Sequence, residues 1–122
     1  MVKNEGKNDI ILAALAHLSG LFLMFIGPLV FYFAVNDKFA KENSRNALNF
    51  QLTVLIATII LCVLAVISIP LMFIIIGIFL FFFVVIAAII LSVAVLVLCL
   101  IATIKAYQGE VYKYPFTIEI IK

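Results

Sequence analysis

The stretch that decides the fold is SIPLMFIIIG, residues 68–77, which lies within a run, 46–104, that contains no charged side chain. As one helix this run would measure about 90 Å, although about 20 apolar residues already cross the roughly 30 Å of hydrocarbon in a bilayer. The run must therefore fold back. Pro70 and Gly77 are the residues in it that interrupt helices most strongly. The sequence predicts a helix over 46–67, a turn over 68–77 and a helix over 78–105.

A second charge-free run extends from Ile10 to Asn36. It is too long for the apolar region of a signal peptide, so we expect a retained first span over about 10–35. Gly27 and Pro28 interrupt this span, and proline in a helix interior produces a kink. The chain is 68% hydrophobic and 11% charged, whereas soluble domains are nearer half apolar and a quarter charged.

These observations predict an all-α, polytopic helical membrane protein that forms a single membrane domain over residues 1–122. Three transmembrane helices are expected, with a polar loop over 36–45 and a short interfacial C-terminal tail over 106–122. Four spans remain the alternative, which requires a second turn between 78 and 104. Ser92 is the best candidate for that turn, and a lone serine is a poor turn signal.

The basic residues suggest an orientation for the three spans. Lys3 and Lys7 precede the first span, whereas the other six Lys and Arg residues lie in the 36–45 loop or at the C-terminal end. Because cytoplasmic loops are enriched in Lys and Arg, we expect the N-terminus outside, and the loop and tail in the cytoplasm, of a plasma-membrane protein. Acidic residues are interleaved with the basic ones, so no nucleic-acid partner is indicated.

His17 is the only histidine of the chain and lies inside the expected first span. An ionisable residue in a membrane is a functional candidate, but a neutral imidazole bonded to a neighbouring helix is the alternative. No Asp or Glu lies within an expected span, which argues against proton-coupled transport. Small residues at helical spacing, including Gly20 and Gly27, predict helix–helix contacts in a bilayer, and hence a homo-oligomer or a larger membrane complex.

The stretch ENSRNALNFQL, residues 42–52, opens the expected second span with more amides than a helix cap requires. Asn46 and Asn49 share one helical face, while Gln51 points elsewhere. This surplus indicates specific hydrogen-bond partners for the amides, with Arg45 as a neighbour of Asn49.

The tail offers such partners. Lys105 suits the C-terminal end of the last helix and Gly109 is a natural helix stop. Tyr112 and Tyr114 alternate with Glu110 and are typical of an aromatic belt at the membrane surface or of a short strand. Because the tail and the amide stretch are expected on the same side, the hypothesis is that Asn49, Gln51 or Arg45 contacts Glu110 or a tyrosine hydroxyl.

Four motifs occur in order and together resemble a known family. They are Ala16-His17-Leu18-Ser19-Gly20, Gly27-Pro28-Leu29, Asn46-Ala47-Leu48-Asn49-Phe50-Gln51, and Ile104-Lys105-Ala106 followed by Gly109-Glu110-x-Tyr112-x-Tyr114-Pro115. The set resembles the Tic-twenty-like family of small prokaryotic membrane proteins, which is distantly similar to a membrane subunit of the chloroplast import machinery. The resemblance implies a polytopic helical membrane protein, not an enzyme, and the four spans of the chloroplast subunit support the four-span alternative.

The sequence contains no nucleophile with a base, carboxylate pair, phosphate loop or metal-ligand cluster. We therefore expect no enzymatic activity, no cofactor, no metal and no small-molecule substrate. The predicted function is that of a structural or accessory subunit that acts through helix packing in the lipid bilayer. The alternative is an oligomeric pore or protein-translocation component, although no expected span carries a polar stripe along its whole length.

Overall fold

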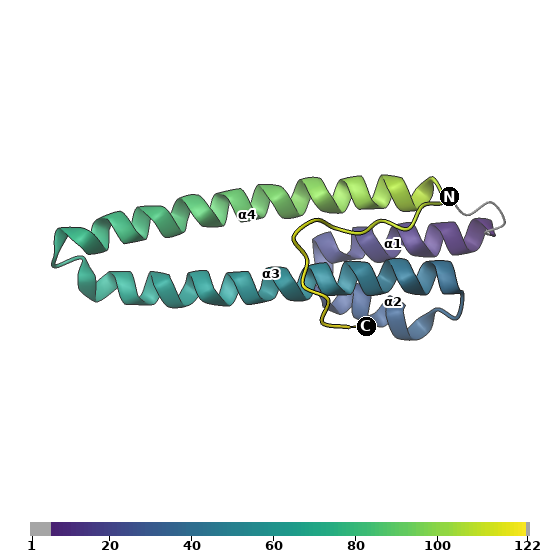
Figure 1. Cartoon of the computed structure of the whole chain (residues 1–122), viewed down its shortest axis with the longest axis horizontal. Helices are drawn as coiled ribbons and strands as arrows, with labels where there is room; N and C mark the ends of the chain where they lie inside the picture. The colour runs from purple at the N-terminus through teal and green to yellow at the C-terminus, as the bar shows by residue number, and fades with distance from the viewer. Residues whose placement is uncertain (1–5, 122) are drawn as a thin grey trace.

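The computed structural model describes residues 6–121, which contain helices and no strand. The all-α prediction is therefore confirmed for these residues. Figure 1 shows two long antiparallel helices and two short helices packed beside one half of them. The four helices are α1 (Lys7–Leu23), α2 (Ile26–Ala34), α3 (Lys38–Leu71) and α4 (Ile75–Tyr107).

The helices α3 and α4 form a hairpin whose turn, 72–74, falls within the stretch 68–77. Pro70 lies in the last turn of α3, and Gly77 lies where α4 passes very close to the end of α3. A Cβ atom at Gly77 would stand 2.0 Å from the carbonyl carbon of Leu71, so only glycine fits there. Within the described residues, α3 and α4 are the helices long and apolar enough to cross a membrane.

The expected first span, 10–35, is not one helix. The chain reverses after Leu23, where Met24 has a φ of 56° and a ψ of −132° and cannot continue a helix. Gly27 and Pro28 are not a kink but the first turn of the returning helix α2, where the missing N–H of proline costs nothing. Gly27 also passes closely over Ser19, so α1 and α2 form a short antiparallel pair. Three transmembrane helices are therefore not confirmed.

The expected polar loop over 36–45 is also mostly helical. Asp37 caps α3 by accepting a hydrogen bond from the Ala40 backbone N–H at 3.0 Å, which starts the helix at Lys38. Because α1 and α2 are antiparallel, the starts of α1 and α3 lie at the same end of the molecule as the end of α4 (Figure 1). The prediction placed the start of the first span across the membrane from the start of the second, and this topology is not confirmed.

Burial divides the molecule into two parts. Residues of α3 up to Val54 and of α4 from Cys99 pack with α1, α2 and the tail, and we call this part the head. The remaining segments, 55–71 and 75–98, are largely exposed apart from a few side chains between the two helices, and we call them the bare hairpin. The charge-free run 46–104 is longer than two spans need because its ends form the core of the head.

After Gly109, whose φ of 87° ends the last helix, the tail runs without regular secondary structure to Ile121. It loops toward the bare hairpin, crosses from α4 to α3, and returns along the head (Figure 1). The expected tail strand is absent from the described residues. Side chains of α3 hold the tail against the head, so the tail forms part of the candidate site.

Candidate functional site: a buried polar network

The centre of the head is a hydrogen-bonded group of three side chains from three segments. His17 of α1 is fully buried, and its Nδ1 lies 2.7 Å from the Tyr114 hydroxyl of the tail. Its Nε2 lies 2.8 Å from the Oδ1 of Asn43 in α3. The imidazole thus joins the first helix, the third helix and the tail.

The neighbours of Asn43 fix which nitrogen of His17 carries the proton. Asn43 donates from its amide nitrogen to the Phe39 carbonyl at 3.1 Å, and its Oδ1 accepts the backbone N–H of Tyr112 at 3.2 Å. The oxygen that faces His17 is therefore an acceptor, so Nε2 carries the hydrogen. Nδ1 must then accept from the Tyr114 hydroxyl, and the imidazole is neutral.

Burial favours this neutral state. Desolvation lowers the pKa of His17 from 6.5 to about 4, and the hydrogen bond with Asn43 opposes the shift only in part. Burial likewise raises the pKa of Tyr114 well above its ordinary value. Both groups are therefore uncharged near neutral pH, and the expected alternative of a neutral imidazole bonded to a neighbouring helix describes this geometry.

Aromatic packing holds the tail side of the network. Phe50 and Tyr114 stack with ring centroids 4.1 Å apart and an interplanar angle of 12°. Tyr112 meets Tyr114 edge-on at 5.0 Å. The sequence suggested that Tyr114 belongs to an interfacial aromatic belt. Its side chain is 3% exposed, so it lies in the core of the head instead. Its ring and its hydroxyl both fasten the tail to the head.

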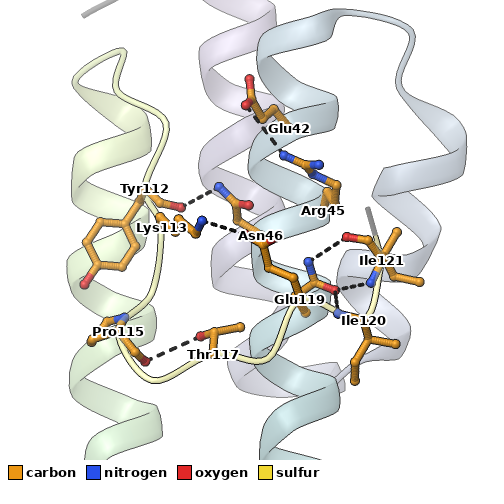
Figure 2. A network of polar contacts seen from close by, with 11 residues as sticks. Glu42, Arg45, Asn46, Tyr112, Lys113, Pro115, Thr117, Glu119, Ile120 and Ile121 are labelled. Carbon is orange, nitrogen blue, oxygen red and sulfur yellow. Dashed lines mark hydrogen bonds and ion pairs between the residues drawn. The ribbon is translucent and has the colours of Figure 1, made fainter.

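The amides of α3 bind the backbone of the tail. The side chain of Asn46 donates to the Tyr112 carbonyl at 3.0 Å, and Asn49 donates to the Ile121 carbonyl at 2.9 Å. The Asn49 oxygen accepts the N–H groups of Ile120 at 3.1 Å and Ile121 at 2.7 Å. Figure 2 shows Tyr112, Ile120 and Ile121 of the tail arranged along the face of α3 that carries Asn46.

The charged residues expected at this contact pair elsewhere. Arg45 lies 3.6 Å from Glu42 of its own helix, and Glu110 lies 3.6 Å from Lys105. The side chains of both pairs are between a third and a half exposed, so the pairs contribute little to stability. The expected contact between Arg45 and Glu110 is therefore wrong, whereas Lys105 and Glu110 close the end of α4.

Gln51 and Gly20 meet at the end of the head nearest the bare hairpin. Gln51 does not reach the tail but donates to the Cys99 sulfur at 3.4 Å. A Cβ at Gly20 would stand 2.7 Å from the Gln51 amide nitrogen, so the glycine lets α1 approach α3. Pro115, by contrast, is exposed at the bend of the tail, where its carbonyl accepts a long bond from Thr117 (Figure 2).

The candidate site residues predicted from the sequence did not include Asn43, Thr53 or Cys99, although Thr53 shares the helical face of Asn46 and Asn49. Asn43 lies inside α3, three residues before Asn46 and on the same side of the helix. Thr53 accepts the N–H of Ile118 at 3.1 Å and extends the line of tail contacts. The spacing of the three asparagines and Thr53 was the available signal for one continuous tail-binding face.

The network is closed. Within residues 6–121, every buried side-chain nitrogen or oxygen has a hydrogen-bond partner. The same residues hold no group of three or more His, Cys, Asp or Glu that could ligate a metal ion. The side chains in the network bond to one another and to backbone, so its geometry is that of a fastening between segments.

A known protein family matches almost the whole of this chain. A family model described as the magnetosome magnetite crystal formation protein family, MamF/MmsF, matches residues 8–121. The chain belongs to this family. The match covers the head, the bare hairpin and the tail, and the family description names no catalytic activity. No curated protein and no solved structure matches the chain significantly.

Membership in the MamF/MmsF family overturns the resemblance to the Tic-twenty-like family. The motifs that suggested it have local physical explanations in this chain. His17 and the amides bind the tail, and the glycines allow close helix approaches. Such short motifs follow from the packing of the head and do not identify the import machinery.

Proposed function

We propose that this protein is a structural or accessory component of a magnetosome membrane, which holds a rigid head at the membrane surface by means of the α3–α4 hairpin. The observation that carries the proposal is the division of the molecule into a bare apolar hairpin and a head in which, among the described residues, every buried side-chain nitrogen or oxygen is paired. The whole chain, 1–122, forms one unit that acts by non-covalent contact with itself or with a larger membrane complex.

The dimensions of the bare hairpin support two membrane crossings. Its segments 55–71 and 75–98 rise about 26 Å and about 36 Å at 1.5 Å per residue, close to the roughly 30 Å of hydrocarbon. The turn leaves backbone groups at two helix ends to be satisfied, which favours a position at the far headgroups over one within the hydrocarbon. Both ends of the described segment, Gly6 and Ile121, then lie on one side, together with every Lys and Arg within residues 6–121. That side is the cytoplasm by the distribution of basic residues.

The alternative of an oligomeric pore or translocation component has less support. Polar side chains on the bare hairpin are few, and the hydroxyls of Thr58 and Ser92 bond to carbonyls of their own helices. The grooves between α3 and α4 are lined mainly by apolar side chains. The loss of the import-family resemblance also removes the reason that first suggested translocation.

Genetic complementation tests the accessory role. A magnetite-forming strain that lacks its own member of this family would receive the wild-type chain, Tyr114→Phe or Tyr112→Phe. Because the network is structural, we expect crystal size to follow the amount of protein in the magnetosome membrane in all three strains. A Tyr114→Phe protein that accumulates normally but leaves crystals as small as in the deletion strain would refute a purely structural network.

Cysteine labelling tests the topology. One cysteine at a time would be introduced at Lys7, Asn36 or Phe73 in a Cys62→Ala background that keeps the buried Cys99, and sealed vesicles would be treated with a membrane-impermeant maleimide. Two crossings predict that Lys7→Cys and Asn36→Cys label from the same side and Phe73→Cys from the other. Labelling of Lys7→Cys from the side opposite Asn36→Cys would restore the three-span topology.

A further inference from the structure

The junction between head and bare hairpin carries a group of exposed apolar side chains that no packing in the head explains. At the α1–α2 turn, the exposed fractions are 75% for Phe22, 56% for Leu23, 48% for Met24 and 55% for Ile26. On the tail, Phe116 is 99% exposed. The two sites come from opposite ends of the chain, yet both lie beside the first residues of the bare hairpin.

Contacts of the neighbouring residues show that both sites lie beside the junction between the head and the bare hairpin. Gly20 lies against Gln51, and Leu21 packs in the cluster of Phe50, Val54 and Cys99, so the α1–α2 turn follows directly beyond them. On the tail, Ile118 bonds to Thr53. Phe116 itself borders a wholly apolar groove on the bare hairpin, with a lining that includes Ile90, Val93 and Val97 of α4.

The backbone at both sites is strained. Within residues 6–121, Met24 and Phe116 are the two non-glycine residues with positive φ, at 56° and 58°. This conformation favours glycine or asparagine, because a Cβ atom is crowded there. Apolar side chains at the two strained, exposed positions point to a use for the side chains themselves.

We propose that these five residues form a membrane collar that inserts into the leaflet on the head side, as a shallow contact in addition to the two crossings. The occupant is lipid because the collar is continuous with the apolar surface of the bare hairpin, whose far end lies about one hydrocarbon thickness away. A turn and a loop that insert to about 5–10 Å would cover the apolar collar residues and leave the charged surface of the head in water. The inference rests on the two-crossing topology proposed above. The residues of the collar are Phe22, Leu23, Met24, Ile26 and Phe116.

The absence of tryptophan from the sequence makes the collar directly measurable. Single variants Phe22→Trp and Phe116→Trp would be placed in phosphatidylcholine vesicles with bromine atoms at defined depths on the acyl chains. Val63→Trp, at the middle of the bare hairpin, is the control within hydrocarbon, and Tyr107→Trp, at the end of α4, is the control in water. All four parent side chains are at least half exposed, so substitution should leave the packing intact.

We expect Phe22→Trp and Phe116→Trp to lose most of their emission to shallow bromines, Val63→Trp to deep bromines, and Tyr107→Trp to aqueous iodide. If Val63→Trp is quenched by lipid but the collar variants are quenched by iodide, the collar is wrong while the topology stands. If Val63→Trp is not quenched by lipid, the topology fails as well. If the collar variants are shielded from both quenchers, protein covers the site and the proposal is overturned. The proposal is also overturned if bromolipids quench Tyr107→Trp as strongly as they quench the collar variants.

Discussion

Acidification should loosen the head through one residue, His17. It is the only histidine of the chain, and its surroundings consist of neutral groups, namely Asn43, Tyr112 and Tyr114. Burial lowers its pKa in the folded protein from 6.5 to about 4. The folded state binds a proton at His17 less readily than the unfolded state does. The contribution of the neutral imidazole to the free energy of unfolding is therefore fully present above pH 6.5 and is lost as the pH falls toward 4.

The size of the effect follows from the same two values. At about 1.36 kcal/mol per pH unit, a change in pKa from 6.5 to about 4 corresponds to roughly 3 kcal/mol in total. Between pH 7 and pH 5 the expected loss is about 2 kcal/mol, since most of the unfolded state but little of the folded state gains a proton there.

The measurement is denaturant unfolding in detergent micelles at pH 7, 6 and 5, followed by the near-ultraviolet circular dichroism of the tyrosines. His17→Gln is the matched control, because glutamine can still donate to Asn43 but does not titrate. We expect the free energy of unfolding to fall with pH in the wild type and to remain level in His17→Gln. Equal slopes in the two proteins, or no slope in the wild type, would refute the assignment of a buried neutral imidazole.

Three further predictions concern the fastening of the tail and the hairpin turn. Tyr114→Phe leaves the His17 Nδ1 without a donor and should cost about 1–3 kcal/mol of unfolding free energy, whereas Tyr112→Phe, whose hydroxyl has no partner within residues 6–121, should stay within about 0.5 kcal/mol. Asn49→Ala removes three hydrogen bonds to Ile120 and Ile121, whereas Asn46→Ala removes one hydrogen bond to Tyr112. Proteolysis of the tail end should therefore accelerate more in Asn49→Ala than in Asn46→Ala, and equal cleavage rates would contradict this ranking. Gly77→Ala places a Cβ 2.0 Å from the backbone of Leu71 and should prevent the native turn, which the helical content and yield of the purified protein would report. Gly20→Ala meets the movable end of the Gln51 side chain and should cost only about 1–3 kcal/mol of unfolding free energy. A native yield for Gly77→Ala would show that the turn differs.

The fold-back of the long apolar run could be predicted because its signals are local. Pro70 lacks a backbone donor, and Gly77 is required by a close approach, so both mark the turn in the sequence itself. The reversal at Met24 is marked only indirectly, by Gly27 and Pro28 in the first turn of α2, and these residues equally indicate a kink. A non-glycine residue with positive φ is unexpected from sequence, and the apolar residues on both sides extend the hydrophobic run across the break.

Hydropathy also could not separate lipid-facing residues from residues in the core of the head. Ala102 and Ile89 are both apolar, yet Ala102 is buried beneath α1 and the tail while Ile89 is 58% exposed on the bare hairpin. The distinction depends on whether a neighbouring segment covers the helix, which is a tertiary property. The first span was overextended for the same reason, since α1 buries its small residues against α3 and α4.

The contact between the amide stretch and the tail could be predicted in outline but not in its atoms. A surplus of amides indicates partners, yet the partners of Asn46 and Asn49 are backbone groups, and backbone groups are the same at every residue of a tail. The tail has no strand or helix to satisfy its N–H and C=O groups, and in the head these groups must be paired. The side chains of Asn43, Asn46, Asn49 and Thr53 pair several of them at intervals along α3, much as a neighbouring strand would. The amides at the start of α3 are therefore explained by the irregular backbone that they hold, and this accounts for their number without a catalytic role.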